Sequence, residues 1–113
     1  MRVIICGSRN WPRPFDVRQR VSILPADTTV VTGGAPGVDT MAHNFARNYG
    51  LHSEVYPADW DTYGKRAGVI RNAQMLDKGA DLVIAFWDGS SPGTKDMMTR
   101  TKRAGVELEL HNV

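Results

Sequence analysis

The sequence predicts an α/β fold: one three-layer domain with a five-stranded parallel sheet in the order 3-2-1-4-5 and helices on both faces. Runs of β-branched and apolar residues alternate with segments of helical periodicity along the chain. Such alternation is typical of parallel strands joined by helical crossovers. The chain has 113 residues, enough for one hydrophobic core and too few for two comfortable domains. We therefore expect residues 1–113 to form a single domain.

The expected elements follow one another as strand and helix in turn. Strands are expected at 2–6, 29–32, 53–57, 81–87 and 106–110. Helices are expected near 14–24, 37–49, 66–78 and 94–104. The second helix has the clearest period, formed by Val38, Met41, Ala42, Phe45, Ala46 and Tyr49. We expect these six side chains to face the core and Gly50 to end the helix.

The apolar pattern of the strands predicts their order in the sheet. VIIC, TVV and LVIAF are continuously apolar, as strands covered on both faces are, whereas SEVYP and VELEL alternate like half-exposed edge strands. An order of 3-2-1-4-5 places the two alternating strands at the edges. It also places a topological switch point between the first and fourth strands, where α/β sheets bind ligands beyond the carboxyl ends.

Composition and charge argue against several classes of protein. Fourteen basic and twelve acidic residues leave a net charge of +2 with the signs interspersed, so we expect neither a nucleic-acid partner nor a membrane. The apolar runs are far shorter than the roughly 20 residues that cross a bilayer. Cys6 is the single cysteine, which excludes a disulfide framework and fits a reducing cytoplasm. His43, His52 and His111 show no ligand spacing, so we expect no metal.

Three glycine-rich loops follow the first, second and fourth strands. They read CGSRNWP, TGGAPGVD and FWDGSSPGT, and they hold six of the eleven glycines. Because the carboxyl ends of parallel strands meet at one edge, we expect the loops to form one pocket. Such glycines either make tight turns or expose backbone N–H groups to an anion, and their convergence favours a phosphate or nucleotide ligand. The absence of G-x-G-x-x-G and G-x-x-x-x-G-K-[ST] argues against conventional NAD and ATPase sites.

We predict a ligand-binding set from these loops and from the start of the third helix. Arg9 and Arg71 are the best-placed cations for a phosphate, because a guanidinium group forms paired hydrogen bonds. Asp39 either caps the second helix or binds ribose hydroxyls or a base edge, since its charge repels phosphate. The predicted ligand-binding residues are Gly7, Ser8, Arg9, Gly33, Gly34, Gly37, Asp39, Arg71, Asn72, Gly89, Ser90, Gly93 and Thr94.

Three tryptophans border the predicted pocket: Trp11, Trp60 and Trp87. Each either packs at the rim or stacks on a base. Trp60 and Tyr63 lie in a long irregular stretch before the third helix. This stretch is also a candidate for pairing with a second copy, and the oligomeric state stays open. A Ser-His-Asp triad is rejected because the nucleophile elbow G-x-S-x-G is absent.

Four ordered blocks of the chain resemble the SLOG superfamily of Rossmann-like domains, most closely its YspA-like (cpYpsA-related) members. The blocks are CGSRNW, TGGAPGVDTMAH, PADWDTYGKRAGVIRNAQML and DLVIAFWDGSSPGT, and they span nearly the whole length. The resemblance implies a binder or processor of nucleotide derivatives, often in signalling or in conflict between cells and mobile elements. We expect no cofactor.

Some blocks are also similar to those of relatives with different activities. GGAPGVDTMAH is similar to a block of DprA, which binds single-stranded DNA, although this chain lacks a basic groove. RNAQM and GSSPGT are similar to motifs of the LOG phosphoribohydrolases, which release a base from nucleoside monophosphates. On that resemblance, Arg71 matches the LOG arginine and residues 89–94 match its phosphate loop. The LOG acid is not matched, because Met97 takes its position and Asp96 lies one residue early, a rotation of about 100° on a helix.

The sequence therefore favours non-catalytic binding of a nucleotide or nucleotide-derived ligand. The alternative is LOG-like hydrolysis of the N-glycosidic bond of a nucleoside monophosphate. If the protein is an enzyme, its candidate catalytic residues are Asp39, Asp96 and Arg71.

Overall fold

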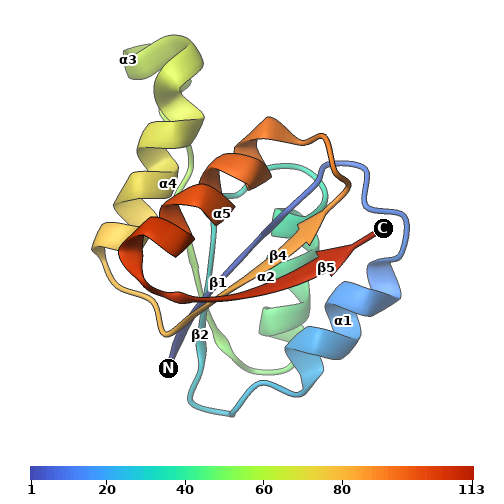
Figure 1. Cartoon of the computed structure of the whole chain (residues 1–113). Helices are drawn as coiled ribbons and strands as arrows, with labels where there is room; N and C mark the ends of the chain where they lie inside the picture. The colour runs from blue at the N-terminus through green and yellow to red at the C-terminus, as the bar shows by residue number, and fades with distance from the viewer.

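The computed structural model describes residues 1–113 and has a five-stranded parallel sheet between two layers of helices (Figure 1). The strands are β1 (Arg2–Gly7), β2 (Thr29–Thr32), β3 (His52–Val55), β4 (Leu82–Trp87) and β5 (Glu107–Asn112). Their order is β3-β2-β1-β4-β5, which confirms the predicted fold class and topology. The continuously apolar strands β1, β2 and β4 are buried, and the alternating strands β3 and β5 form the partly exposed edges.

The helices are α1 (Pro14–Ser22), α2 (Val38–Asn48), α3 (Trp60–Tyr63), α4 (Ala67–Asp77) and α5 (Pro92–Ala104), with a 3₁₀ turn η1 (Gly64–Arg66) before α4. In Figure 1, α1 and α2 cover one face of the sheet, and α4 and α5 cover the other. The short helix α3 and the turn η1 were not predicted. Asp59 caps α3 by accepting a hydrogen bond from the backbone N–H of Thr62 at 3.1 Å, and Gly64 ends it with a φ of 56°.

Alternate residues of the central strands enter two separate cores. Val3 and Ile5 of β1 face α1 and α2, whereas Ile4 and Cys6 face α4 and α5. On the first side, the Phe86 ring lies edge-on to Trp11 at 5.4 Å and stacks on His111 at 4.5 Å. Covering both faces of β1 and β4 fixes their carboxyl ends, from which two of the three glycine loops leave.

The predicted core face of α2 is largely confirmed. Val38, Ala42 and Ala46 are fully buried, and Met41 and Phe45 pack partly buried against the same core. The prediction is wrong for Tyr49, which is 41% exposed. Its side chain leaves the core because α2 ends at Asn48 and Gly50, with a φ of 75°, reverses the chain.

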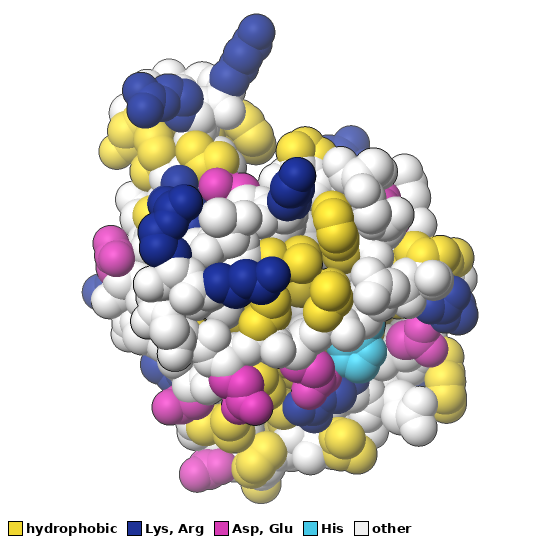
Figure 2. Space-filling model, in the orientation of Figure 1, with side chains coloured by type: hydrophobic (Ala, Val, Ile, Leu, Met, Phe, Trp, Pro, Cys, Tyr) yellow, Lys and Arg dark blue, Asp and Glu magenta, His cyan; other side chains and the backbone are white.

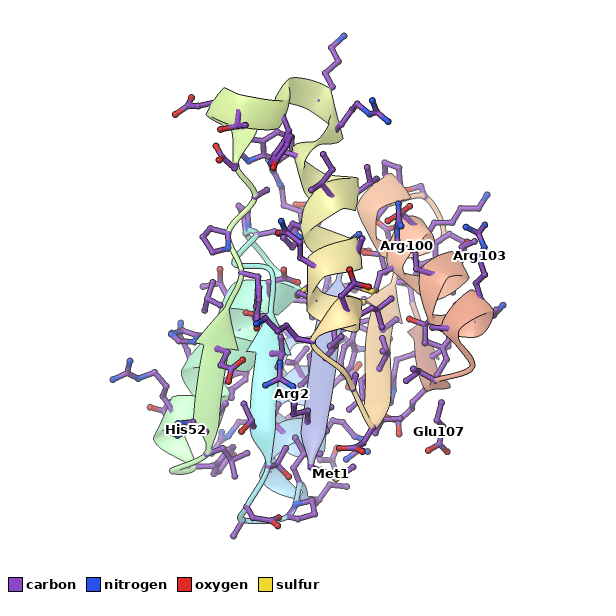
Figure 3. The ribbon with its side chains drawn as sticks, turned by 90° about the vertical axis from the view of Figure 1, so that its left-hand side faces the viewer. Met1, Arg2, His52, Arg100, Arg103 and Glu107 are labelled. Carbon is purple, nitrogen blue, oxygen red and sulfur yellow. The ribbon has the colours of Figure 1, made fainter.

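The two ends of the sheet differ in what they carry. Met1, His52 and Glu107 lie at the end where strands begin, and α3 projects beyond the opposite end, where the glycine loops lie (Figure 3). We call residues 60–66, which form α3 and η1, the arm. The arm packs against α4. None of the helices has both the length and the apolar composition that spanning a bilayer requires.

Candidate functional site

A cavity of about 160 Å³ lies at the carboxyl edge of the sheet, and we call it the first cavity. The loops after β1, β2 and β4 all contribute to it, together with the first half of α2, α4 and the start of α5. Its lining residues are Cys6, Gly7, Arg9, Ala35, Pro36, Asp39, Arg71, Asn72, Met75, Ser91, Gly93 and Thr94. The switch point between β1 and β4 therefore has a hollow bordered by both charged and polar groups.

A second cavity, of about 220 Å³, adjoins the first towards the arm. Its lining residues are Arg9, Gly33, Gly34, Ala35, Pro36, Pro57, Ala58, Trp60 and Arg71. Arg9, Ala35, Pro36 and Arg71 line both cavities. The two hollows are therefore neighbouring parts of one site, separated by the loop after β2 and by two arginines.

Asp39 is the buried acid of the first cavity, with 5% of its surface exposed. Its Oδ2 accepts hydrogen bonds from the backbone N–H of Gly33 at 3.1 Å and of Ala35 at 3.3 Å. Burial raises the pKa of Asp39 to about 6, while the hydrogen bond from Ala35 and the positive charge of Arg71 limit the rise. The carboxylate thus shapes the glycine loop from inside and remains able to exchange a proton near neutral pH.

Arg71 of α4 reaches across to the same loop. Its Nη1 donates a hydrogen bond to the Gly33 carbonyl at 2.6 Å, and its Nε donates to Asn72 Oδ1 at 3.1 Å. A Cβ at Gly33 would collide with this guanidinium group. The guanidinium group therefore occupies the space that a side chain on Gly33 would take, and its Nη2 has no hydrogen-bond partner in the protein.

Asn72 connects α4 to α5 beneath the cavity. Its Nδ2 donates to the Gly93 carbonyl at 3.2 Å and to Asp96 Oδ2 at 3.0 Å. The same Asp96 oxygen accepts from Arg100 Nε at 2.8 Å. Asp96 lines neither cavity, because these bonds hold its carboxylate between α4 and α5. The candidate catalytic set therefore comes down to Asp39 and Arg71 as the members that line the first cavity.

The start of α5 offers backbone donors to the first cavity. Pro92 has no N–H, and Gly93 and Thr94 lie in the first turn, where N–H groups have no intrahelical acceptor. No side chain caps this helix, since Ser91 at the cap position makes no such bond. The positive end of the helix dipole adds to these two N–H groups. Together they form an arrangement that suits an anion.

The preceding loop is organised by its own side chains. Asp88 Oδ1 accepts hydrogen bonds from the backbone N–H of Ser90 at 2.9 Å and of Ser91 at 2.8 Å, and these bonds lower the pKa of Asp88. The Asp88 N–H donates to the buried Ser8 Oγ at 3.0 Å. The amides of Ser90 and Ser91 are thus already paired, which leaves Gly93 and Thr94 as the open donors.

The loop glycines fall into two kinds. A Cβ at Gly7 would lie 2.7 Å from the Phe86 carbonyl and from Val38, and Gly37 has a φ of 89° and lies against the backbone of Arg9. These glycines are required by close packing of backbone on backbone. A Cβ at Gly93, by contrast, would meet no atom within 4 Å beyond its own turn of α5, and its φ is not in the left-handed region. The fold alone does not require a glycine at Gly93.

Most of the predicted ligand residues come together. Those that line the first cavity are Gly7, Arg9, Asp39, Arg71, Asn72, Gly93 and Thr94. Gly33 and Gly34 line the second. Ser8, Gly37, Gly89 and Ser90 line neither. Ser8 is a buried acceptor for the fourth-strand loop, Gly37 backs onto the first loop, and Gly89 and Ser90 lie in the turn that Asp88 closes.

Several residues that line the first cavity were not predicted from the sequence. Cys6 is the last of the alternate β1 residues that face α4 and α5. Burial raises the pKa of its thiol well above the ordinary range. Met75 lies one turn after Arg71 on α4, so helical spacing could have placed both on one face. Ala35, Pro36 and Ser91 belong to loops already singled out. Their distance along the chain from the predicted ligand residues was thus the signal in the sequence that could have identified them.

The fold and the site define a class: an α/β domain of Rossmann-like topology with a polar hollow at its switch point. The YAcAr family, described as the YspA, cpYpsA-related SLOG family, matches residues 1–63, more than half of the chain. The chain is 37% identical over 116 residues to the "Gene 61 protein" of Mycobacterium phage D29, an alignment that covers 95% of this chain and 93% of the relative. The chain belongs to the YspA, cpYpsA-related SLOG family.

Proposed function

We propose that this protein binds a nucleotide or nucleotide-derived ligand in the first cavity, with a phosphate group on the start of α5. Gly93 is the observation that carries the proposal. It lines the cavity, it has no packing or backbone reason to be a glycine, and it precedes an unpaired N–H at Thr94. A glycine at this place leaves the main chain open to a ligand oxygen.

The charges around the cavity support an anionic ligand at one end and a polar, uncharged group at the other. Arg9 is exposed, lines both cavities and forms no ion pair within the protein. Arg71 keeps one guanidinium nitrogen unpaired. Asp39 repels phosphate when ionised, so its carboxylate suits a sugar hydroxyl, which can donate a hydrogen bond to it. A phosphorylated sugar meets both requirements in one molecule.

Two substitutions at Gly93 test the proposal. The side chains of Gly93→Asp and of its neutral isostere Gly93→Asn both enter open space. A carboxylate near a helix N-terminus stabilises the helix by about 0.3–1 kcal/mol, so the Asp variant should still fold. Calorimetry with adenosine 5′-monophosphate should show at least about tenfold weaker binding to Gly93→Asp than to Gly93→Asn, because the new charge repels the phosphate. Lys95→Ala changes the charge of the same helical turn outside both cavities, so it controls for nonspecific electrostatic attraction of the anionic ligand. Equal affinities for the Asp and Asn variants would contradict the proposed phosphate position.

The second candidate function is hydrolysis of the N-glycosidic bond, and the raised pKa of Asp39, about 6, favours it. A carboxyl group that exchanges a proton near neutral pH suits general acid or base catalysis. Asp39 then acts at the sugar and Arg71 beside it, whereas Asp96 is held by Asn72 and Arg100. Release of free base from nucleoside monophosphates, lost in Asp39→Asn and kept in Asp96→Asn, would support this function over binding alone.

A further inference from the structure

The second cavity has an exposed aromatic wall that the phosphate site does not use. Trp60 of α3 is 60% exposed and lines this cavity together with Gly34, Pro36 and Pro57. An indole buried in a core removes a large apolar surface from water, yet this one is largely exposed on α3, the helix that projects beyond the sheet (Figure 1). Its flat face therefore stays available to a partner that stacks.

Gly68, in the first turn of α4, keeps a gap open beside this indole. A Cβ there would lie 3.8 Å from Trp60 Cη2 and 3.9 Å from Arg71 Nη2, both ordinary contact distances. Its φ is not left-handed, so the backbone accepts an alanine. Glycine within a helix costs up to about 1 kcal/mol relative to alanine. The fold forgoes that stability at the point where a side chain would narrow the space between the indole and the guanidinium group.

The two cavities are placed so that one ligand can enter both. They share Arg9, Ala35, Pro36 and Arg71, and Arg71 Nη2 borders the gap without a protein partner. The rest of this guanidinium group is fixed by the Gly33 carbonyl and by Asn72. A phosphate at the start of α5 and a planar ring beside Trp60 would then lie on either side of Arg71.

The other charged and polar groupings of the surface do not form a defined binding site. Figure 2 shows Lys and Arg side chains spread over the visible face and the arm, separated by hydrophobic and uncharged surface rather than joined in one groove. His43 Nδ1 lies 2.6 Å from Ser53 Oγ, but no carboxylate completes this pair. No group of three His, Cys, Asp or Glu side chains is gathered as metal ligands. Trp60 is the feature whose surroundings point to a defined chemical group.

We propose that the second cavity binds the base of the nucleotide, stacked on Trp60 with Arg71 at its edge. This inference rests on the proposed function, because it assigns the other half of the same ligand. Every base has a π face, so stacking on an indole favours the presence of a base over its identity. The guanidinium nitrogen that remains can donate a hydrogen bond to a ring nitrogen or carbonyl.

Paired ligands test this assignment. Calorimetry compares adenosine 5′-monophosphate with ribose 5-phosphate, which has the sugar and phosphate but no base. The unaltered protein should bind the nucleotide at least about tenfold more tightly, as expected for one stacked base. Trp60→Ala should remove most of this advantage and leave the affinity for ribose 5-phosphate unchanged, whereas Trp60→Phe should keep most of it. Tyr63→Ala removes an exposed aromatic ring from the same arm and lines neither cavity, so it is the matched control.

The outcomes separate this inference from the proposed function. If both ligands bind equally well, or if Trp60→Ala weakens both by the same factor, the base does not lie on Trp60, although the phosphate site stands. If Tyr63→Ala has the same effect as Trp60→Ala, the arm acts through its fold and the stacking assignment is overturned. If neither ligand binds the unaltered protein, the proposed function fails and the base subsite fails with it. Gly68→Ala gives an independent check, since it should weaken the nucleotide alone.

Discussion

Replacing Asp39 with asparagine should stabilise the protein at neutral pH. Both loop hydrogen bonds end on one oxygen, Oδ2, so the amide oxygen of asparagine can accept them in its place. Burial raises the pKa of Asp39 from 3.8 to about 6, which means that the folded protein holds the neutral acid more tightly than the unfolded chain does. Each pKa unit corresponds to 1.36 kcal/mol, so the ionised carboxylate costs about 3 kcal/mol of folding free energy at high pH.

The sign of the pH dependence follows from the raised pKa. The cost is absent below the ordinary value of 3.8, grows as pH rises through about 6, and is complete above it. Urea unfolding from pH 4 to pH 8 should therefore show Asp39→Asn and the parent protein nearly equal at the acid end. At pH 8 the variant should be more stable by about 1–3 kcal/mol, because it lacks the buried charge. The lower end of this range applies if the neutral amide accepts the loop hydrogen bonds less strongly than the carboxylate does.

Asp27→Asn removes one negative charge from an exposed position and reports the effect of net charge alone. A difference between Asp39→Asn and the parent that does not change with pH would show that Asp39 has no raised pKa. A variant less stable than the parent at pH 8 would show that Arg71 and the loop amides outweigh burial. A confirmed gain would show that the protein keeps a destabilising charge at its candidate site, as functional sites often do.

Three further predictions concern the frame that holds the site. Gly37→Ala should lower the free energy of unfolding by more than about 2 kcal/mol in urea titration, since it adds a Cβ at a φ of 89° against the Arg9 backbone. An unchanged free energy of unfolding would contradict the described packing of the two loops. Phe86→Ala, at a fully buried ring, should cost about 3–5 kcal/mol in the same assay, and a loss below 1 kcal/mol would contradict the described core. Arg20→Gln should lower the free energy of unfolding by less than about 1 kcal/mol at pH 7, because its ion pair with Glu109 is partly exposed. Arg20 lowers the pKa of Glu109, so thermal melts should show the difference between variant and parent fading as pH falls below 4.5. A difference that grows towards low pH would refute the pairing.

The fold was largely readable from local sequence because its strands differ in apolar pattern. Continuous runs mark β1, β2 and β4 as central, and alternation marks β3 and β5 as edges, which was enough to order the sheet. The arm could not be read in this way, because α3 is four residues long and too short to show a period. Tyr49 followed the helical spacing but lies past the last helical residue, where periodicity no longer fixes direction.

The sequence predicted which residues lie at the candidate site better than it predicted the role of each. Motif position and the common edge of parallel strands brought Asp39, Arg71 and Gly93 to one cavity. That Gly33 makes room for a guanidinium group from a residue 38 positions later is a tertiary contact that no local pattern reports. Ser8 likewise looked like a ligand donor, but it is fully buried and accepts a hydrogen bond from the fourth-strand loop.

We propose that a ligand phosphate lies on the backbone at the start of α5. A titration of the ¹⁵N-labelled protein with adenosine 5′-monophosphate, followed by amide NMR shifts, tests it most directly because it reports on each N–H separately. Gly93 and Thr94 should show the largest shifts, with smaller shifts at Ala35 on the facing loop. Shifts confined to another face, or no shifts at any ligand concentration up to the millimolar range, would contradict it.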